Sequence, residues 1–263
     1  GTSFGNAGVI SPWSCVPQSL PGQWKKIPRW VLSPEGPVAL RWTYLPYLMP
    51  WLVRFLASAQ ASRIDRIADG ILSLNRNCPE LYRELLRGTG HENLVCDSCY
   101  IHVFRDSRQA DSGQVQWALR RERGVPMEFV SGDEAREIEP ALSPAYQGAV
   151  LIRGQARALN PGRLGQVLAD KARDLGVVFT RALVQELMPG NSGSFRIRTE
   201  QGIVSSPRAV VAGGAWSARL LAPLGVRVSL EAERGYHVVF ANPGVALNNS
   251  VLDGDRKFVA SSM

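Results

Sequence analysis

The density of proline near the start of the chain restricts the fold more than any other sequence feature, because eight prolines fall between Pro12 and Pro50. Each proline fixes its own φ and disfavours helical geometry at the residue before it, so no long helix can run through most of this segment. Four tryptophans are interleaved with the prolines, and such large rings need a surface to pack against. We predict an extended, turning and ordered path.

The most apolar stretch of the chain, YLMPWLVRFLASAQ, overlaps the last of these prolines. Pro50 and Arg54 interrupt it, and it is shorter than the ~20 apolar residues that a membrane-spanning helix needs. With a membrane-spanning helix excluded, we interpret the stretch as a helix that is buried or lies at an interface. We expect the segment from Tyr44 to Leu56 to pack mostly inside the molecule, with part of its rim exposed.

Helix and strand patterns follow one another in the next part of the chain. Apolar residues recur at near-helical spacing from Ile64 to Leu86, and Gly88 follows them, which predicts core helix. The runs Tyr100–Phe104 and Val125–Val130 are typical of strands. The first half therefore combines helices with strands.

A short acidic helix is predicted after the second of these strands. Ser131 or Asp133 is placed to cap its N-terminus, and Pro140 stops it. Glu137 and Glu139 could be imagined as an acid and base pair. Because they are two residues apart on a helix and face different sides, we interpret them as part of a solvated face.

In the second half of the chain, predicted helices and strands alternate as they do in an α/β sheet. An amphipathic helix over Pro161–Leu175 ends at Gly176, and a strand pair is predicted over Val177–Pro189. Alternating strands with a turn at Gln201–Gly202 then lead to an apolar run over Ala209–Ala212 that ends in two glycines. Such an edge is where ligands collect beyond the carboxyl ends of strands.

The charge of the chain argues against nucleic acid as a partner. The formal net charge is +7, but the 30 basic residues are scattered among 23 acidic ones. No basic stripe or cluster is formed, and such a cluster is the usual footprint of a nucleic-acid interface. We expect no nucleic-acid binding.

Cysteine and histidine do not predict a disulfide scaffold or a metal site. Four cysteines are too few for a disulfide framework in a chain of this length, and a reducing, cytoplasmic compartment is expected. Cys96 and Cys99 form a lone C-x-x-C with no second ligand pair, so we interpret them as thiols in or beside a strand. His91, His102 and His237 are too dispersed to indicate a metal site.

The chain opens with GTSFGNAGVISP, a loop with almost no side chains. Gly5, Ala7 and Gly8 would let the backbone approach a flat ligand closely, and glycine can adopt dihedral angles closed to other residues. The same residues are equally typical of a solvated turn. The loop alone leaves both interpretations open.

Three separated segments together resemble one protein family. TSFGNAG at Thr2–Gly8, LNPGRLGQVLADKARDLGVVF at Leu159–Phe179 and AVVAGGAWSARLLAPLGVRVSLEAERGYHV at Ala209–Val238 are similar to the FAD-dependent amino acid oxidoreductases of the D-amino acid oxidase superfamily. The proline- and tryptophan-rich path looks most like the small subunit of D-amino acid dehydrogenase. The resemblance covers almost the entire chain.

The resemblance implies a mixed α/β fold with two lobes. An FAD-binding lobe would be discontinuous, formed by residues 1–12 and 149–222, and a substrate-binding lobe on a mixed or antiparallel sheet would take residues 13–148 and 223–263. Relatives begin with a G-x-G-x-x-G turn that holds the FAD pyrophosphate at a helix N-terminus. No such turn occurs here, so we expect an internal fragment, incomplete at both ends.

The resemblance also implies a cofactor site made of small residues. Ser3 and Asn6 would offer hydrogen bonds to the flavin, and Ala7 and Gly8 backbone contact. The turn Ala212, Gly213 and Gly214 would pass beside the dinucleotide. Val184 would bracket the adenine, although it could equally be plain strand core.

Two residues are implied on the substrate side. Tyr236 would orient an amino acid substrate, and Arg234 could hold its carboxylate or serve as a structural ion-pair partner. Near the end of the chain Arg256 alone offers a further guanidinium. No catalytic residue is assigned, because the flavin performs the chemistry.

The implied reaction is hydride transfer from Cα of a D-amino acid to flavin N5, after which the imino acid hydrolyses to a 2-oxo acid and ammonia. Electrons would pass to a respiratory-type acceptor, with peripheral contact of the Tyr44–Leu56 segment at the inner face of the plasma membrane. One alternative is an oxygen-using oxidase similar to glycine or sarcosine oxidase. Another is an inactive fragment that acts only as a binding or folding module. Because the fragment is expected to lack strands, exposed sheet edges would favour its self-association.

Overall fold

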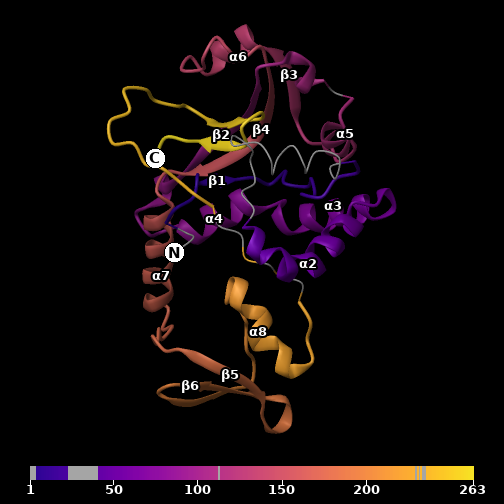
Figure 1. The fold of residues 1–263 in the computed structure, drawn as a ribbon. Helices are drawn as coiled ribbons and strands as arrows, with labels where there is room; N and C mark the ends of the chain where they lie inside the picture. The colour runs from indigo at the N-terminus through magenta and orange to yellow at the C-terminus, as the bar shows by residue number, and fades with distance from the viewer. Residues whose placement is uncertain (1–3, 23–40, 112, 229, 231, 233–234) are drawn as a thin grey trace. The chain divides into compact units, whose positions relative to one another are not determined.

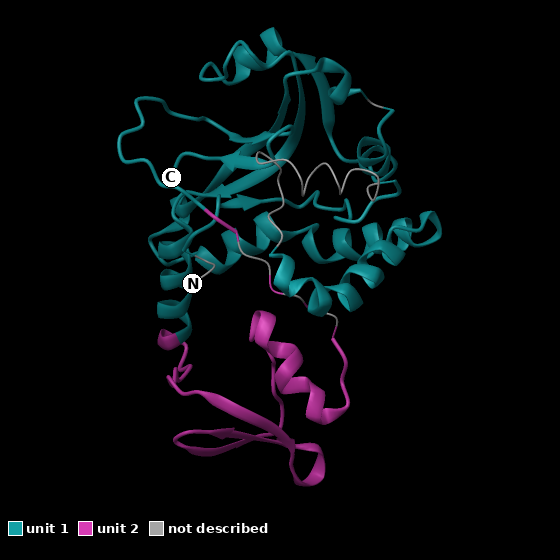
Figure 2. Cartoon of the chain, in the orientation of Figure 1, with its two compact units in different colours: residues 1–172, 237–263 teal, residues 173–236 magenta. Residues whose placement is uncertain are grey.

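The computed structural model describes residues 4–22, 41–111, 113–228, 230, 232 and 235–263 (Figure 1). The chain divides into two compact units, one of residues 1–172 with 237–263 and the other of residues 173–236 (Figure 2). Each unit is described by itself below.

The first unit is built on a six-stranded mixed sheet in the order β1-β4-β2-β8-β9, with β3 also paired to β4. The long central strands β2 (Val95–Phe104) and β4 (Gly148–Ala158) are antiparallel. β1 (Val9–Ile10) and β3 (Met127–Ser131) both pair with the free edge of β4, at its opposite ends. β8 (Ser250–Asp253) runs parallel to β2 and forms a hairpin with β9 (Phe258–Ala260).

Three buried clusters hold helices against this sheet. α5 (Val115–Glu122) places Trp117 on one face, where it packs in a cluster with Phe104 and Val150. α6 (Gly132–Ile138) packs Ala135 into a second cluster. This cluster includes Ile101, whose side chain points to the opposite face of β2 from that of Phe104. A third cluster joins the ends of β1, β2 and β4 to α4 (Cys78–Leu86) and α7 (Pro161–Asp174). Alternating side chains of the two long strands thus bury both sheet faces.

Several local predictions are confirmed. The hydroxyl of Ser131 accepts the backbone N–H of Glu134, whose carboxylate in turn accepts the backbone N–H of Ser131, a complete capping box at the start of α6. The helical pattern before Gly88 forms two helices, α3 (Ala61–Asn75) and α4, because the chain is interrupted just before Pro79. The four cysteines are free thiols, and Cys96 and Cys99 lie on β2.

The solvated face predicted for the acidic helix is wrong for one of its two glutamates. Glu137 is exposed, but Glu139 has 0% exposure at the C-terminal end of α6. Its Oε2 accepts the backbone N–H of Asn249 at 2.8 Å. A residue 110 positions further along the chain therefore supplies the hydrogen bond that burial of this carboxylate requires.

The apolar segment also differs from its prediction. Residues Leu45–Ser58 form helix α2 as expected, with Pro50 inside it, but none of its residues is buried. Tyr47 and Val53 are exposed, and so is Trp42 in the 3-10 turn η2 (Trp42–Tyr44) before it. The expectation that this segment packs mostly inside the molecule is therefore wrong. Of the proline-rich path, residues 12–22 follow turns without helix or strand, and residues 23–40 lie outside the described residues.

The second unit contains a three-stranded antiparallel sheet in the order β5-β6-β7. Its strands are β5 (Val184–Pro189), β6 (Phe195–Thr199) and β7 (Gly202–Ser206), and the turn predicted at Gln201–Gly202 joins the last two. The 3-10 turn η5 (Asn191–Gly193) lies between β5 and β6. Helix α8 (Ser217–Leu221) lies between the 3-10 turns η6 (Gly214–Trp216) and η7 (Ala222–Leu224).

Two apolar runs of this unit form no strand, contrary to the prediction. Residues 177–183 and 208–213 have no regular secondary structure, and Val178 and Val210 are 86% and 92% exposed. A strand needs a neighbour for its backbone N–H and C=O groups, and neither run has a paired strand among the described residues. The mixed α/β class predicted from the sequence is confirmed.

Candidate functional site

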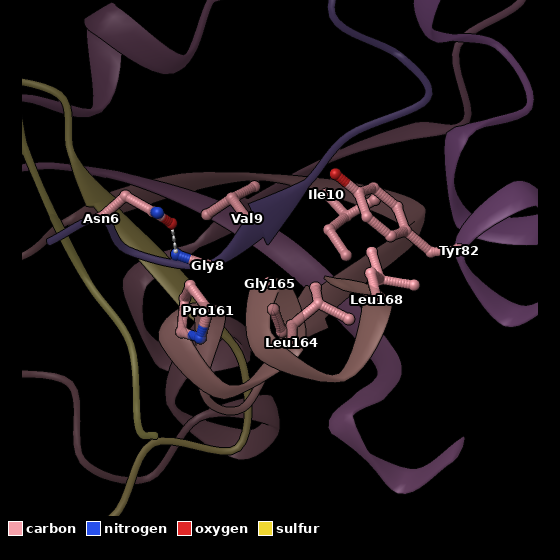
Figure 3. Close-up of a pocket in the computed structure, with 10 residues that line it drawn as sticks. Asn6, Gly8, Val9, Ile10, Tyr82, Pro161, Leu164, Gly165 and Leu168 are labelled. Atoms are coloured by element: carbon pink, nitrogen blue, oxygen red, sulfur yellow. Dashed lines mark hydrogen bonds between the residues drawn. The ribbon is translucent and has the colours of Figure 1, made fainter. Parts of the chain in front are cut away.

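A pocket of about 260 Å³ lies where the N-terminal loop meets α7 (Figure 3). One wall comes from the loop and β1, another from the first turns of α7, and one residue from α4. The lining residues are Asn6, Gly8, Val9, Ile10, Tyr82, Ala158, Pro161, Leu164, Gly165 and Leu168. Two residues of the predicted cofactor site, Asn6 and Gly8, are thus part of one cavity wall.

The loop needs glycine at position 8. Gly8 has a φ of +67°, and a Cβ built on it would lie 2.4 Å from the carbonyl oxygen of Ala158. The close approach allows the backbone N–H of Ala158 to donate to the oxygen of Gly8 at 2.7 Å. The N–H of Gly8 in turn donates to Oδ1 of Asn6 at 2.8 Å (Figure 3). Side chain and backbone together fix the shape of the loop against the end of β4.

At position 5 the loop is approached by the exposed side chain of His237. A Cβ on Gly5 would lie 2.4 Å from Cε1 and 2.7 Å from Nδ1 of His237. The ring of Phe4 lies where a side chain on Gly162 of α7 would be, 2.8 Å from the built Cβ. The absence of a side chain at Gly5 therefore leaves room for the ring of the distant His237, and its absence at Gly162 leaves room for the loop's own Phe4 ring on α7.

The α7 wall of the pocket is set by the start of that helix. Oδ1 of Asn160 accepts the backbone N–H of Arg163 at 2.9 Å, as an N-cap does. Leu164 and Leu168 then follow at helical spacing on the pocket side, with Gly165 between them. Tyr82 is the one phenol in the lining and its ring lies beside Ile10 (Figure 3).

This lining suits a flat, largely apolar ring with a few polar atoms. Leucine and isoleucine side chains supply apolar contact, while Asn6 and Tyr82 supply hydrogen-bonding groups. At Gly8 a Cβ would collide with backbone, so this loop position can carry no side chain that would narrow the cavity. A flavin ring is a group of this kind, and the residues present fit it.

The other predicted site residues fall into three groups. Ala7 is half-buried in the loop but does not line the pocket. Val184, Ala212, Gly213 and Gly214 belong to the second unit, where Val184 begins β5 opposite Thr199 and Gly214 begins η6 with a φ of +56°. Tyr236 is 87% exposed at the end of that unit. Ser3 and Arg234 lie outside the described residues.

Sequence reasoning did not single out Tyr82, which lines the pocket, or His237, whose ring lies beside Gly5 of the loop. Tyr82 lies on a core helix, and no local motif distinguishes it from a packing residue. His237 follows directly after Tyr236, so its position next to a predicted substrate residue was the one available signal. Both are placed by chain segments remote from the loop.

The face of β4 that carries Gln155 and Arg157 holds buried polar groups without partners. Both side-chain polar atoms of Gln155 and Nε of Arg157 are buried and have no hydrogen-bond partner among the described residues. Nη1 of Arg157 donates to the backbone oxygens of Leu247 at 3.2 Å and Ser262 at 3.4 Å. Arg157 is the Cα partner of Val9 in β1, so this guanidinium is anchored one strand from the loop.

His102, on β2, is a buried titratable group of the first unit. Its ring packs edge-on against Tyr100 and Trp117, with centroids 4.6 and 5.4 Å away. Burial, together with the positive charges of Arg120 and Lys257, holds the pKa of His102 well below its usual value of 6.5. The neutral imidazole is therefore a structural part of this aromatic cluster.

Within the described ranges, no three His, Cys, Asp or Glu side chains are grouped closely enough to hold a metal ion. Among the same residues, no helix has both the length and the apolar character needed to span a bilayer.

Comparison with known proteins places this chain among flavoenzymes. A family model described as FAD dependent oxidoreductase matches residues 1–262. A D-amino-acid oxidase of Bradyrhizobium diazoefficiens is 35% identical over 260 residues, which cover 98% of this chain and 62% of the relative. A D-amino acid dehydrogenase of Rhizobium rhizogenes is 27% identical and covers 100% of this chain and 64% of the relative. The chain spans about three fifths of the length of these relatives.

Solved structures share the fold at low sequence identity. The iminodiacetate oxidase of Chelativorans sp. BNC1 has a TM-score of 0.55 at 21% identity, covering 96% of this chain and 57% of that one. The glycine oxidase of Geobacillus kaustophilus has a TM-score of 0.54 at 23% identity, covering 86% and 48%.

Proposed function

Since this chain belongs to the DAO family of FAD-dependent oxidoreductases, we propose that the full-length protein oxidatively deaminates a D-amino acid to a 2-oxo acid and ammonia. The relative at 35% identity is named D-amino-acid oxidase, and two relatives at 27% identity are named D-amino acid dehydrogenase. These names agree on the D-amino acid and differ on the electron acceptor.

The observation that carries the proposal is the glycine loop at the pocket. We propose that Asn6 and Gly8 hold one edge of the flavin and that Ile10, Leu164 and Leu168 pack against its ring system. FAD, when bound, supplies the acceptor for the hydride that leaves Cα of the substrate. The chain itself orients the ring, excludes water from the apolar wall and offers the hydroxyl of Tyr82 as a hydrogen-bonding group.

The remaining cofactor contacts are proposed for the second unit. Ala212, Gly213 and Gly214 would pass beside the dinucleotide and Val184 beside the adenine, with Ser3 and Ala7 completing the loop. These assignments belong to an FAD lobe of residues 1–12 and 149–222. The substrate lobe would then be residues 13–148 and 223–263, with Tyr236 and Arg234 toward the amino acid.

The substrate class is tested by anaerobic reduction of the purified full-length protein. D- and L-amino acids of each side-chain type are added in turn, and the visible flavin absorbance is followed. We expect bleaching by one or more D-amino acids and by none of the L-enantiomers. Bleaching by L-amino acids alone, or by glycine and sarcosine alone, would reject the D-amino acid assignment.

The electron acceptor is proposed to be of the respiratory type, with oxygen as the second candidate because the relative at 35% identity is named an oxidase. Turnover is measured once with a soluble quinone analogue and once in air with detection of peroxide. A dehydrogenase turns over quickly with the quinone and releases little peroxide. Rapid peroxide release at the same substrate concentration favours the oxidase.

A cytoplasmic location, with contact at the inner face of the plasma membrane through α2, is also proposed. Its exposed aromatic and apolar side chains, Tyr47, Met49 and Val53, together with Trp42, have no covering element among the described residues. Aromatic side chains of this kind favour the bilayer interface. Self-association through the exposed apolar runs at 177–183 and 208–213 is a separate proposal, tested by sedimentation at rising protein concentration.

A further inference from the structure

The loop at the pocket is bordered by an imidazole that neither the family match nor the sequence motifs assign to a function. Cε1, Nδ1 and Nε2 of His237 lie 2.4, 2.7 and 3.1 Å from the position that a Cβ on Gly5 would take. Three adjacent ring atoms therefore fill the space where residue 5 lacks a side chain. His237 and Gly5 both belong to the first unit.

We propose that His237 is a positioning residue for the flavin loop, acting as the wall against which Phe4–Gly8 is held. The inference rests on the proposed function, because it takes this loop to face the flavin. The loop has two other supports, the ring of Phe4 on Gly162 and the hydrogen bond between Ala158 and Gly8. His237 is the support on the side of Gly5.

The loop needs support from a neighbouring side chain such as His237 because it has few side chains of its own. Between Phe4 and Val9 only Asn6 has a side chain beyond Cβ, and it is used to accept the N–H of Gly8. A glycine-rich segment has more backbone freedom to lose than any other, so its bound shape must be imposed by neighbours. Removing a neighbour lets the loop sample other shapes and lowers the fraction ready to bind.

His237 is also the residue next to Tyr236, which we propose to contact substrate. His237 and its neighbours Val238 and Val239 are all exposed. The two valines provide matched controls in the same segment, because the atoms nearest to the built Cβ of Gly5 all belong to His237.

The test is a double-mutant cycle in the full-length protein, using Gly5→Ala, His237→Ala and the pair. The readouts are the dissociation constant for FAD, from fluorescence titration of apoprotein, and the midpoint of thermal unfolding. In the His237 background, Gly5→Ala places a methyl group where the exposed ring of His237 lies and displaces that ring from the loop, so we expect FAD binding to weaken several-fold. In the His237→Ala background the same change meets no ring, and its effect should fall to about twofold or less.

His237→Ala alone should weaken FAD binding several-fold, His237→Phe should restore much of it by refilling the space, and Val238→Ala should change little. Gly235→Ala is the control for glycine replacement, because a Cβ there meets nothing within 4 Å. Equal effects of Gly5→Ala in both backgrounds, or unchanged FAD binding in His237→Ala, would overturn the proposal.

Gly8→Ala separates this failure from failure of the proposed site. If Gly8→Ala weakens FAD binding and the variants at positions 5 and 237 do not, the loop holds the flavin and His237 has no role in it. If none of the three alters FAD binding while Gly5→Ala and His237→Ala remain coupled in thermal stability, the contact exists and the flavin lies elsewhere, which rejects both proposals.

Discussion

The hydroxyl of Tyr146 donates a hydrogen bond of 2.8 Å to Oδ2 of Asp253, a carboxylate with 1% exposure at the end of β8. The other oxygen of Asp253 accepts the backbone N–H groups of Asp255 and Arg256 at 2.9 and 2.8 Å. One buried carboxylate thus joins the loop before β4 to the turn between β8 and β9.

Replacing Asp253 by Ala should destabilise the first unit more than replacing Tyr146 by Phe. The alanine leaves three buried or half-buried donors unpaired, whereas the phenylalanine removes one donor. We expect a loss of about 2–4 kcal/mol in the free energy of unfolding for Asp253→Ala and about 1 kcal/mol for Tyr146→Phe. Urea unfolding followed by circular dichroism measures both, and an equal loss in the two variants would contradict the assignment.

The stability of the first unit should fall at alkaline pH through its tyrosines. Burial raises the pKa of Tyr100 to about 12, and burial with the bond to Asp253 raises that of Tyr146 to about 12. The folded state then keeps a proton that the unfolded state loses near pH 10, so stability is complete below about pH 10 and decreases toward pH 12. Tyr100→Phe should flatten this decrease; a pH profile of unfolding that is unchanged in the variant would refute it.

At acid pH the stability should fall through His102. Its folded-state pKa is depressed, so the unfolded state binds a proton below about pH 6.5 that the folded state does not accept. The stabilisation is present above pH 6.5 and is lost as the pH falls. His102→Phe fills a similar space in the aromatic cluster, and its midpoint of unfolding should drop less than that of the parent between pH 7 and pH 5. His91→Phe, at a half-buried position outside this cluster, is the control.

Two glycines that line the same pocket should respond to alanine in opposite directions. Gly8→Ala places a methyl group 2.4 Å from a backbone oxygen at a positive φ, and we expect it to cost about 2 kcal/mol or more. A Cβ on Gly165 meets nothing within 4 Å inside α7, so Gly165→Ala should stabilise the helix by about 0.5–1 kcal/mol. Thermal unfolding of both variants tests the pair. If Gly8→Ala lowers the midpoint of unfolding no more than Gly165→Ala does, the loop tolerates a side chain at position 8 and the prediction is wrong.

Membrane contact through α2 is tested with vesicles of mixed neutral and anionic lipid. The parent protein should float with the vesicles, and Tyr47→Ser with Val53→Ser should reduce the bound fraction several-fold. Leu74→Ser and Leu81→Ser, which also remove exposed apolar side chains but from α3 and α4, provide the control. Equal flotation of all three proteins would reject α2 as the contact.

Local signals in the sequence predicted the elements well where the decisive partners are near in the chain. The capping residue Ser131 acts within a few positions of the helix that it caps, so the start of α6 could be predicted from the local sequence. Pro161, preceded by Asn160, likewise marks the start of α7. These elements agree with their predictions.

Distant partners account for the errors. Glu139 was predicted to be solvated because no local pattern in the sequence connects it to Asn249, the residue that donates a hydrogen bond to its carboxylate. The run at 209–212 has the composition of a buried strand, yet composition does not supply the neighbouring strand that pairing requires. At the site, the small residues of the loop could be recognised in the sequence, but the position of the His237 ring beside Gly5 could not be predicted from it.

The parallel pairing of β2 with β8 fixes the order in which this protein can be completed during synthesis. Tyr100 pairs with Ser250, and all of the second unit lies between them in the chain. While the ribosome adds those residues, β2 can already pair with β4. The other edge of β2 has no partner strand during this time, and Glu139 lacks the hydrogen bond from Asn249, which has not yet been added. Contacts of such long range slow folding. The growing chain therefore keeps one edge of β2 without its partner until residue 253 has been added, and unpaired strand edges are prone to aggregation.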